Sequence, residues 1–268
     1  NIIVMDNCVR KTPKISIITV CYNSEKYLEE TIQSVLRQNY QNVEYIIIDG
    51  GSTDNTVSII DKYRQYITYF VSEPDNGISD AFNKGIRVAT GDVIGIINSD
   101  DLLEEGALER VAQEYAPSVD WYRGDCKVWN DQTGFVFIEH PTLDWPAIPI
   151  KMRGAHPSTF VSRNAYRKYG TFGVDLRYAM DTDLFIRFSR HRAVVKYVPQ
   201  VLACFRLGGV SQSDEIKRTD ELKLILRRNG STSFQIFIWE MIYKFRLSVK
   251  HFMMLFGEDA RFLLAKKF

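Results

Sequence analysis

The most constraining feature of this sequence is a regular alternation of short apolar runs and helix-like periods between residues 15 and 116. The run KISIITV is rich in β-branched residues and too short for a buried helix, so it predicts a strand buried on both faces. The next segment places Leu28, Ile32, Val35 and Leu36 on one helical face. The same pair of patterns recurs after VEYIIID, ITYFVS and DVIGIIN. This alternation predicts an α/β fold with a mainly parallel sheet and helices on both of its faces.

The pattern changes after residue 116. Antiparallel strands are predicted at VDWYRGDCKVWN and GFVFIEH, and a long Pro-rich loop follows them. Helical spacing returns at YAMDTDLFIRFSRH, where Leu184, Phe185 and Phe188 form the buried face, and two late strands are predicted at AVVKYV and VLACFRL. We therefore divide the chain into halves at 13–116 and 117–212 and a helical extension at 213–268.

The overall composition excludes several classes of protein. The formal net charge is +1, whereas nucleic-acid-binding proteins usually carry a basic excess. Four scattered cysteines without a C-x-x-C pair argue against a zinc site or a disulfide framework, and they fit a reducing cytoplasm. The opening NIIVMDNC does not resemble a signal peptide, and no apolar run reaches the roughly 18 residues of a membrane span.

Polar and acidic residues follow each of the four predicted parallel strands. Ligands of open parallel sheets bind beyond the carboxyl ends of the strands, so we expect one site at this edge, for a ligand that carries a cation or hydroxyl groups. The dinucleotide-binding and Walker glycine patterns are both absent from the sequence. The residues at this edge are Tyr22, Asn23, Asp49, Gly50, Gly51, Ser52, Asp54, Glu73, Asp75, Asn76, Gly77, Asn98, Ser99, Asp100 and Asp101.

The adjacent carboxylates Asp100 and Asp101 end the fourth apolar run. Two neighbouring anions repel each other, and a divalent cation between them would relieve that repulsion. In the alternative interpretation, Ser99 or Asp100 caps the next helix and both acids face water. Ser52 and Asp54 are likewise able to cap a helix.

Several motifs, in order, resemble those of one enzyme family. PKISIITVCYNSEKYLEETIQSVLRQNY, EYIIIDGGSTDNT, GISDAFNKGI and GDVIGIINSDD are similar to the start of family 2 glycosyltransferases with the GT-A fold. The resemblance extends from about Pro13 to Ser211, and it implies a GT-A catalytic domain at 13–212. It also implies inverting sugar transfer from a nucleotide sugar, usually a UDP-sugar, with Mn²⁺ or Mg²⁺. By this resemblance, Asp100 and Asp101 hold the metal and the donor diphosphate.

The resemblance further implies which residues bind the nucleotide sugar. Asn98 departs from the family, because many relatives have Asp there and Asn is a weaker metal ligand. Gly50 departs as well, because some relatives carry a second acid there that binds uracil, so GDP and dTDP remain alternative nucleotides. Asp80 alone could instead be a first-turn acid of a helix. The implied donor-binding residues are Val20, Tyr22, Asn23, Asp49, Gly51, Ser52, Asp80, Asn83, Asn98, Ser99 and Asp100.

Inverting transfer needs a carboxylate that takes the proton from the acceptor hydroxyl. The segment RYAMDTDLFIR offers Asp181 and Asp183. Family members carry an acidic dipeptide before x-D-L-x-x-R, and its second acid is the base, so Met180 replaces the first acid and Asp181 matches the base. The alternative makes both acids helix-terminal residues, and we expect that role for Asp183. We expect Arg187 to pair with a local acid.

Two further residues have two interpretations each. His156 stands where relatives bring a loop over donor or acceptor, although a lone histidine is more often structural. Arg206 begins a segment that resembles the family's flexible loop over the diphosphate, and it would either contact phosphate or be a surface cation.

The C-terminal segment from Ser231 mixes aromatic, aliphatic and basic residues. That composition suits an amphipathic helix in a membrane interface, and the alternative is a helix packed on the domain or across a dimer. Similar bacterial enzymes extend glycans on polyprenyl-diphosphate lipids, so we predict a peripheral protein on the cytoplasmic face of the membrane. A nucleotidyltransferase would need a basic glycine-rich loop, which TVCYNSEKYL is not. A non-catalytic scaffold with the same fold stays an alternative, and the oligomeric state stays open.

Overall fold

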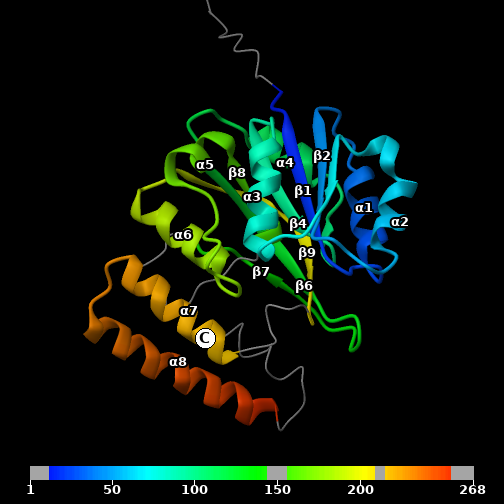
Figure 1. The fold of residues 1–268 in the computed structure, drawn as a ribbon. Coiled ribbons are helices and arrows are strands. Elements are labelled where there is room, and N and C mark those ends of the chain that lie inside the picture. The colour runs from blue at the N-terminus through cyan, green and yellow to red at the C-terminus, as the bar shows by residue number, and fades with distance from the viewer. Residues whose placement is uncertain (1–11, 144–155, 209–214, 255–268) are drawn as a thin grey trace, which may run out of the picture.

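The computed structural model describes residues 12–143, 156–208 and 215–254. Within these residues one nine-stranded sheet has the order β3-β2-β1-β4-β8-β6-β9-β5, and β7 pairs with β6 (Figure 1). The mixed sheet is mainly parallel in its first half, as the alternating sequence pattern predicts.

The four predicted parallel strands are all present and adjacent in the sheet. β1 pairs in parallel with β2 on one side and β4 on the other, and β3 pairs in parallel with β2. Every residue of β1 is buried, because helices cover both faces of this part of the sheet. The strands are β1 (Ile15–Cys21), β2 (Val43–Asp49), β3 (Tyr69–Ser72) and β4 (Val93–Asn98).

The helices of the first half connect these strands. In α2 the buried residues are Thr56, Ile59 and Ile60. The connecting helices are α1 (Leu28–Leu36), α2 (Thr56–Lys62) with the short η1 (Arg64–Tyr66), α3 (Ile78–Val88) and α4 (Ala107–Glu114).

The second half completes the sheet in a way that the sequence predicted only in part. The two predicted late strands form one continuous strand, β9, and β8 was not predicted because its four residues carry no clear period. β8 lies between β4 and β6 and is antiparallel to both. A Cβ on Gly95 of β4 would lie 2.5 Å from Cε1 of Phe160, so this position has room only for glycine. The new elements are β5 (Leu102–Leu103), β6 (Trp121–Trp129), β7 (Val136–Glu139), η2 (His156–Ser158), β8 (Thr159–Ser162), α5 (Arg163–Tyr169), α6 (Met180–Arg190) and β9 (Val195–Arg206).

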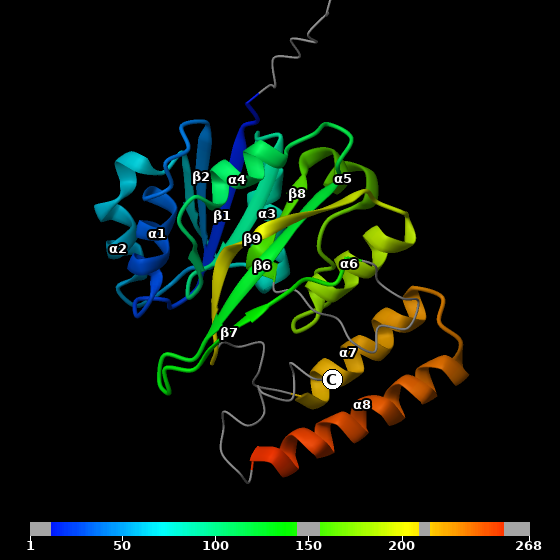
Figure 2. The same ribbon diagram turned by 180° about the vertical axis from the view of Figure 1, so that it is seen from behind.

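Two hydrophobic cores lie on opposite faces of the sheet (Figures 1 and 2). The core beneath α3, α5 and α6 contains Phe82, Tyr166 and Phe185. The core beneath α1, α2 and α4 contains Ile32 and Leu108. The sheet therefore has the three-layer arrangement that the sequence predicts.

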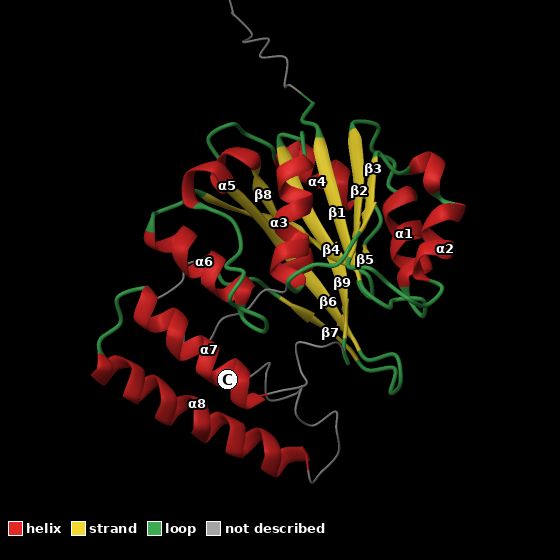
Figure 3. Cartoon of the chain, in the orientation of Figure 1, coloured by secondary structure: helices red, strands yellow, loops and turns green. Residues whose placement is uncertain are grey.

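The C-terminal residues form a helical hairpin of α7 (Glu215–Arg228) and α8 (Ser233–Met254) beside α6 (Figure 3). Leu226 of α7 and Trp239 of α8 are buried in the same core as Leu184 of α6. The hairpin is thus packed on the domain through one of its faces. None of the described helices has the length and apolar character needed to cross a bilayer.

Candidate active site

The carboxyl ends of the parallel strands meet at one edge of the sheet. In the strand register, Asn98 lies beside Val20 and Asp49 lies beside Cys21. Asp49 also lies beside Ser72 at the end of β3. The register brings all four strand-end groups of the sequence analysis together, and Val20 itself is a buried residue of this edge.

Asp49 organises the loop that follows β2. Its carboxylate is fully buried and accepts hydrogen bonds from Ser52 N at 3.0 Å and Ser52 Oγ at 2.5 Å. Ser72 Oγ donates to the same carboxylate at 2.5 Å. Gly51 has φ +83°, a backbone conformation that suits glycine. Asp49 therefore shapes the loop rather than facing a ligand directly.

The loop after β1 is tied to the loop after β2. Asn23 has φ 48°, and its side-chain Oδ1 accepts a hydrogen bond from Thr53 N at 2.9 Å. Asn23 N donates to Ser52 Oγ at 2.8 Å, which connects this loop to the Asp49 network. Tyr22 is 63% exposed, so its ring faces outward at the same edge.

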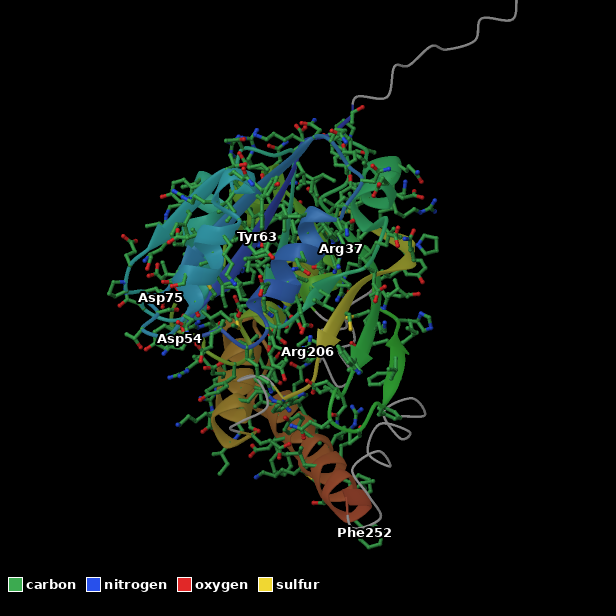
Figure 4. The ribbon with its side chains drawn as sticks, turned by 90° about the vertical axis from the view of Figure 1, so that its right-hand side faces the viewer. Arg37, Asp54, Tyr63, Asp75, Arg206 and Phe252 are labelled. Atoms are coloured by element: carbon green, nitrogen blue, oxygen red, sulfur yellow. The ribbon has the colours of Figure 1, made fainter. Side chains whose placement is uncertain are left out.

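Gly50 and Asp75 occupy neighbouring positions at this edge. A Cβ on Gly50 would lie 2.7 Å from Asp75 Oδ2 and 3.4 Å from the Tyr22 ring. The Asp75 carboxylate therefore fills the space that a side chain at position 50 would take. Figure 4 labels Asp75 and Asp54 on this side of the molecule.

The turn after β4 gives Asp100 and Asp101 different roles. Asp101 is fully buried, and its carboxylate accepts from Asn98 Nδ2 at 2.9 Å and from Arg206 N at 3.0 Å. Thr31 Oγ1 donates to the Asp101 carbonyl at 2.8 Å. Within the described residues, the Asp100 carboxylate has no hydrogen bond to another side chain. This geometry argues against Asp101 as a metal ligand and leaves Asp100 as the acid that the turn presents.

Arg206 fixes the backbone of this turn through hydrogen bonds to Asp100 and Asp101. Its Nε donates to the Asp100 carbonyl at 3.1 Å, and the guanidinium contacts Glu30 at 2.7 Å and Asp131 at 3.3 Å. The guanidinium also lies over the rings of Tyr27 and Trp129, at 4.1 and 4.5 Å from their centroids. The residue is only 4% exposed, so the predicted alternative of a surface cation is wrong. Its side-chain donors bind Asp100, Asp131 and Glu30, which argues against direct phosphate contact.

The electrostatics of the turn disfavour two ionised carboxylates. Burial raises the pKa of Asp101 well above its ordinary value, and the neighbouring Asp100 carboxylate raises it further. Burial also raises the pKa of Asp100, while the Arg206 guanidinium opposes that change. A divalent cation at Asp100 would favour the charged form of the carboxylate.

The oxygen atoms at this turn fit a hard divalent ion such as Mn²⁺ or Mg²⁺. Asn98 Oδ1 is buried and has no hydrogen-bond partner among the described residues. Those residues contain no cluster of three or more His, Cys, Asp or Glu able to hold a metal by themselves. An ion held by Asp100 would therefore take its remaining ligands from substrate phosphates and water, as Mg²⁺ usually does.

Ser99 links this turn to the loop after β1, because its hydroxyl lies 2.8 Å from Ser24 Oγ. Ser24 N in turn donates to Thr56 Oγ1 at 2.7 Å, at the start of α2. Three strand-end loops are thus joined in one hydrogen-bonded rim.

Asp181 lies in the first turn of α6. Burial raises the pKa of its carboxyl, while a hydrogen bond from Thr182 N at 2.6 Å and the guanidinium groups of Arg123 and Arg218 favour the charged form. Asp183 lies in the first turn of α6, as predicted, and it pairs with Arg187 at 3.0 Å, in line with the prediction that Arg187 contacts a local acid.

Ser79 and Asn83 of α3 hold the loop that leads into α6. Ser79, in the first turn of α3 just after the rim, donates to the Leu176 carbonyl at 3.0 Å. Asn83 donates to the Phe172 carbonyl at 2.9 Å and accepts from Phe172 N at 3.0 Å. Both ends of the Asn83 amide are thereby used inside the protein, which argues against the predicted role in donor binding.

The chain matches the model of Glycosyl transferase family 2 over residues 16–160, more than half of its length. The chain belongs to this family. Glycosyltransferase GlyG of Streptococcus pneumoniae is 39% identical over 103 residues, which make up 37% of this chain. The match spans about a third of GlyG's length, 34%.

Two solved structures have the same fold as this family 2 glycosyltransferase. S. aureus TarS 1-349 in complex with UDP-GlcNAc has a TM-score of 0.63 at 18% identity, covering 85% of this chain and 70% of that one. The mannosyltransferase PcManGT from Pyrobaculum calidifontis, in complex with GDP-Man and Mn²⁺, has a TM-score of 0.62 at 18% identity. It covers 95% of this chain and 79% of PcManGT. Both confirm the GT-A architecture.

The remaining predicted residues of the glycosyltransferase lie as follows. Asp80 accepts a hydrogen bond from Asn76 N at 3.1 Å and lies 4.0 Å from Lys84, so it supports the turn before α3. His156 stacks on Phe82 at 5.1 Å between ring centroids, and burial lowers the pKa of its imidazole to about 4. The histidine is therefore a neutral, packed residue in the structure.

Sequence reasoning missed two residues near this glycosyltransferase site, Arg123 and Glu221, and the contact that a third, Asp75, makes. Arg123 is fully buried on β6 and lies over the Phe185 ring at 4.6 Å, and a lone arginine in a strand gave no signal of this. The location of Asp75 against Gly50 follows only from the folded loops. Glu221 contacts the backbone just before Asp181 from α7, more than 40 residues away along the chain.

Proposed function

We propose that this glycosyltransferase moves a sugar from a nucleotide sugar to a hydroxyl of a growing cell-surface glycan. We propose a UDP-sugar as the donor. The proposal rests on two carboxylates of different character, one in the turn after β4 and one in the first turn of α6. Asp100 lies in a turn whose backbone is held by a hydrogen bond from Arg206. Asp181 lies at the start of a helix, and Ser79 of α3 binds the loop before that helix.

Asp100 would hold Mn²⁺ or Mg²⁺ together with the donor diphosphate. When bound, the ion neutralises the charge that develops on the leaving nucleotide diphosphate. The protein's part is to hold the Asp100 backbone in place, through Arg206 and the internal hydrogen bonds of Asp101. Tyr22, Asn23 and the loop at Gly51 and Ser52 would surround the nucleoside.

Asp181 would act as the general base. An inverting transfer needs a carboxylate that accepts the proton of the acceptor hydroxyl while that oxygen attacks the anomeric carbon. The raised pKa of Asp181 brings its basicity closer to neutral pH than that of a free aspartate, which suits proton transfer. The nearby Arg123 and Arg218 guanidinium groups keep the charged form accessible.

Nucleotide binding with and without metal tests the donor half of the proposal. We would measure thermal melting against UDP, GDP, CDP and dTDP, each with and without Mn²⁺. A ligand at 100 times its Kd adds about 2.7 kcal/mol of stability. A Mn²⁺-dependent shift with UDP supports the UDP-sugar, and a shift with GDP would change the donor to one like that in the PcManGT complex. If none of the four nucleotides changes the melting temperature, the transferase proposal is refuted and a non-catalytic scaffold is favoured.

Asp181→Asn tests the catalytic half. The variant should bind UDP and Mn²⁺ as the unchanged protein does and should lose sugar transfer, because the amide cannot accept the proton. Near-normal turnover would exclude Asp181 as the base.

We also propose that α8 docks on an anionic membrane surface, where a polyprenyl-diphosphate-linked acceptor would be presented. One face of α8 is turned away from the core and carries an apolar stripe, with its last described side chain, Phe252, near the tip of the helix (Figure 4). Lys244 beside the stripe is 67% exposed and would face lipid head groups. The stripe consists of Phe234, Phe237, Met241, Phe245, Val249 and Phe252, which are 36–73% exposed.

Vesicle sedimentation tests this surface. Phe237→Glu with Phe245→Glu should release the protein from vesicles rich in anionic lipid. Val194→Glu, at an apolar residue 50% exposed away from the hairpin, is the matched control and should leave binding unchanged. If the protein does not sediment with vesicles but elutes as a dimer that the α8 changes disrupt, the stripe binds a second copy instead.

A further inference from the structure

The N-terminus of α6 is held by a side chain from the C-terminal hairpin. Glu221 of α7 accepts hydrogen bonds from three consecutive backbone N–H groups, those of Arg177 at 2.7 Å, Tyr178 at 2.8 Å and Ala179 at 3.0 Å. Ala179 is the N-cap residue of α6 and provides no capping side chain of its own. Glu221 therefore binds the backbone that leads into α6, from a distant helix.

A carboxylate is well suited to this position. The N–H groups at the start of a helix have no partner within the helix, and the helix dipole makes this end partly positive. The two Glu221 oxygens accept from the N-cap N–H and the two N–H groups before it, and charge-assisted hydrogen bonds of this kind are stronger than neutral ones. The backbone that leads into α6 is thus fixed two residues before Asp181.

α7 is itself firmly seated, so Glu221 is a fixed anchor. Leu222, Ile225 and Leu226 are buried in the core that also contains Leu184 of α6. Arg228, in the last turn of α7, pairs with Asp175 in the loop before α6. Two side chains of the hairpin, Glu221 and Arg228, therefore contact the segment before Asp181.

We propose that Glu221 is a positioning residue for Asp181, so that α7 is part of the catalytic apparatus and not only a support for α8. The inference rests on the proposed function, in which Asp181 is the general base. Glu221 contacts no reacting atom; it sets the direction in which the first turn of α6 presents its carboxylate.

Two α7 variants separate positioning from simple docking of the hairpin. Glu221→Gln keeps the size of the side chain but removes the charge and one accepting oxygen. Arg228→Gln removes a different contact of the same helix with the same loop, the ion pair with Asp175, and is the matched control. Both variants should lower the melting temperature by a few degrees.

The kinetic readout is the rate of nucleotide release from the best donor among UDP-GlcNAc, UDP-glucose and GDP-mannose, with water as acceptor. We expect Glu221→Gln to lower kcat about tenfold or more, because a positioned general base contributes roughly 10²–10⁴-fold to a rate. KM for the donor and the Mn²⁺ requirement should not change, since the donor edge does not contact Glu221. Arg228→Gln should keep kcat within about twofold of the unchanged protein, since general-base catalysis is left intact.

A substrate-free readout is the titration of the Asp181 carboxyl by NMR. In Glu221→Gln its pKa should fall towards the ordinary value, because the side chain is no longer held in its buried position, and in Arg228→Gln it should stay. An unchanged Asp181 titration together with an unchanged kcat in Glu221→Gln would overturn the inference. Failure of the proposed function is a separate result, namely full activity in Asp181→Asn or no nucleotide binding by the unchanged protein.

Discussion

Replacement of Arg206 is the most informative perturbation of the donor edge. Arg206→Met keeps a side chain of similar length but removes the guanidinium that contacts the Asp100 carbonyl, Glu30 and Asp131. It also removes the cation that lies over the Tyr27 ring. The Arg206 backbone N–H that binds Asp101 stays, so the variant tests the side chain alone.

The expected cost follows from the exposure of the groups left behind. Breaking a buried ion pair costs about 3–5 kcal/mol when the remaining charge stays buried. Here the Glu30 side chain is 54% exposed and that of Asp131 is 22% exposed, so both acids regain water. We therefore expect a loss below that range, about 2 kcal/mol, which includes the hydrogen bond to the Asp100 carbonyl. For a domain of this size the melting temperature should fall by roughly 4–8 °C, at about 2–4 °C per kcal/mol.

The functional effect should appear in the metal dependence. Without the hydrogen bond from Arg206 Nε, the Asp100 backbone is free to move, and a hydrogen bond contributes about 1–1.5 kcal/mol. The Mn²⁺ concentration that gives half-maximal stabilisation by UDP should rise about tenfold, the factor that corresponds to 1.4 kcal/mol. Melting curves at a series of Mn²⁺ concentrations and fixed UDP give both quantities.

Arg187→Met is the matched control for this experiment. Arg187 also donates to backbone carbonyls, those of Tyr169 and Thr171, and also pairs with an acid, Asp183. It contacts neither Asp100 nor Asp101, so its replacement should lower stability without a change in the Mn²⁺ requirement. If Arg206→Met loses stability yet keeps the normal Mn²⁺ requirement, Arg206 does not position Asp100.

Three further results are expected. Burial raises the pKa of Asp181 and the Arg123 cation opposes this, so activity should fall on acidification at a pH above 3.8. Arg123→Met should move this acidic limb of kcat to higher pH. An unmoved limb would show that Arg123 does not act on the group that titrates. Burial lowers the pKa of His156 from its ordinary value of 6.5 to about 4 in the folded state. The stability that its neutral form contributes is therefore complete above pH 6.5 and is lost as the pH falls towards 4. In urea unfolding, His156→Phe should reduce this acid-dependent loss of stability by at most about 3 kcal/mol. Gly50→Asp should weaken nucleotide binding, because its Cβ would lie 2.7 Å from Asp75 Oδ2 and the two carboxylates would repel each other. Adding Asp75→Gly should restore binding, and calorimetry that finds no rescue would contradict this argument.

The fold was predictable where the sequence has a clear period. β2 was predicted residue for residue, because VEYIIID is a continuous buried run between polar turns. β8 was missed because Thr159–Ser162 is short and its burial comes from strands on both sides. β9 was predicted as two strands, because polar and exposed residues near Gln200 interrupt the apolar runs.

The location of the site was predictable from the sequence, but the role of each individual side chain in it was not. Parallel strands end at one edge by geometry alone, so the collection of polar residues there followed from the pattern. The different roles of Asp100 and Asp101 depend on which carboxylate Arg206 N and Asn98 reach in the folded turn. Asn83 similarly matches a family motif, and only the packing of Phe172 shows that its amide is used internally.

The placement of β8 affects how this chain must fold. β8 occupies the side of β4 that β1 leaves open, and it comes more than 60 residues later in the sequence. Until residues 159–162 arrive, Val93–Gly95 remain an unpaired strand edge with an apolar surface, the kind of edge that recruits other chains. A fragment that stops near residue 116 would therefore associate through β4, and long-range pairing of this kind slows folding of the whole domain. Production of the first half alone, for nucleotide-binding studies, would require β8 to be supplied as a separate peptide.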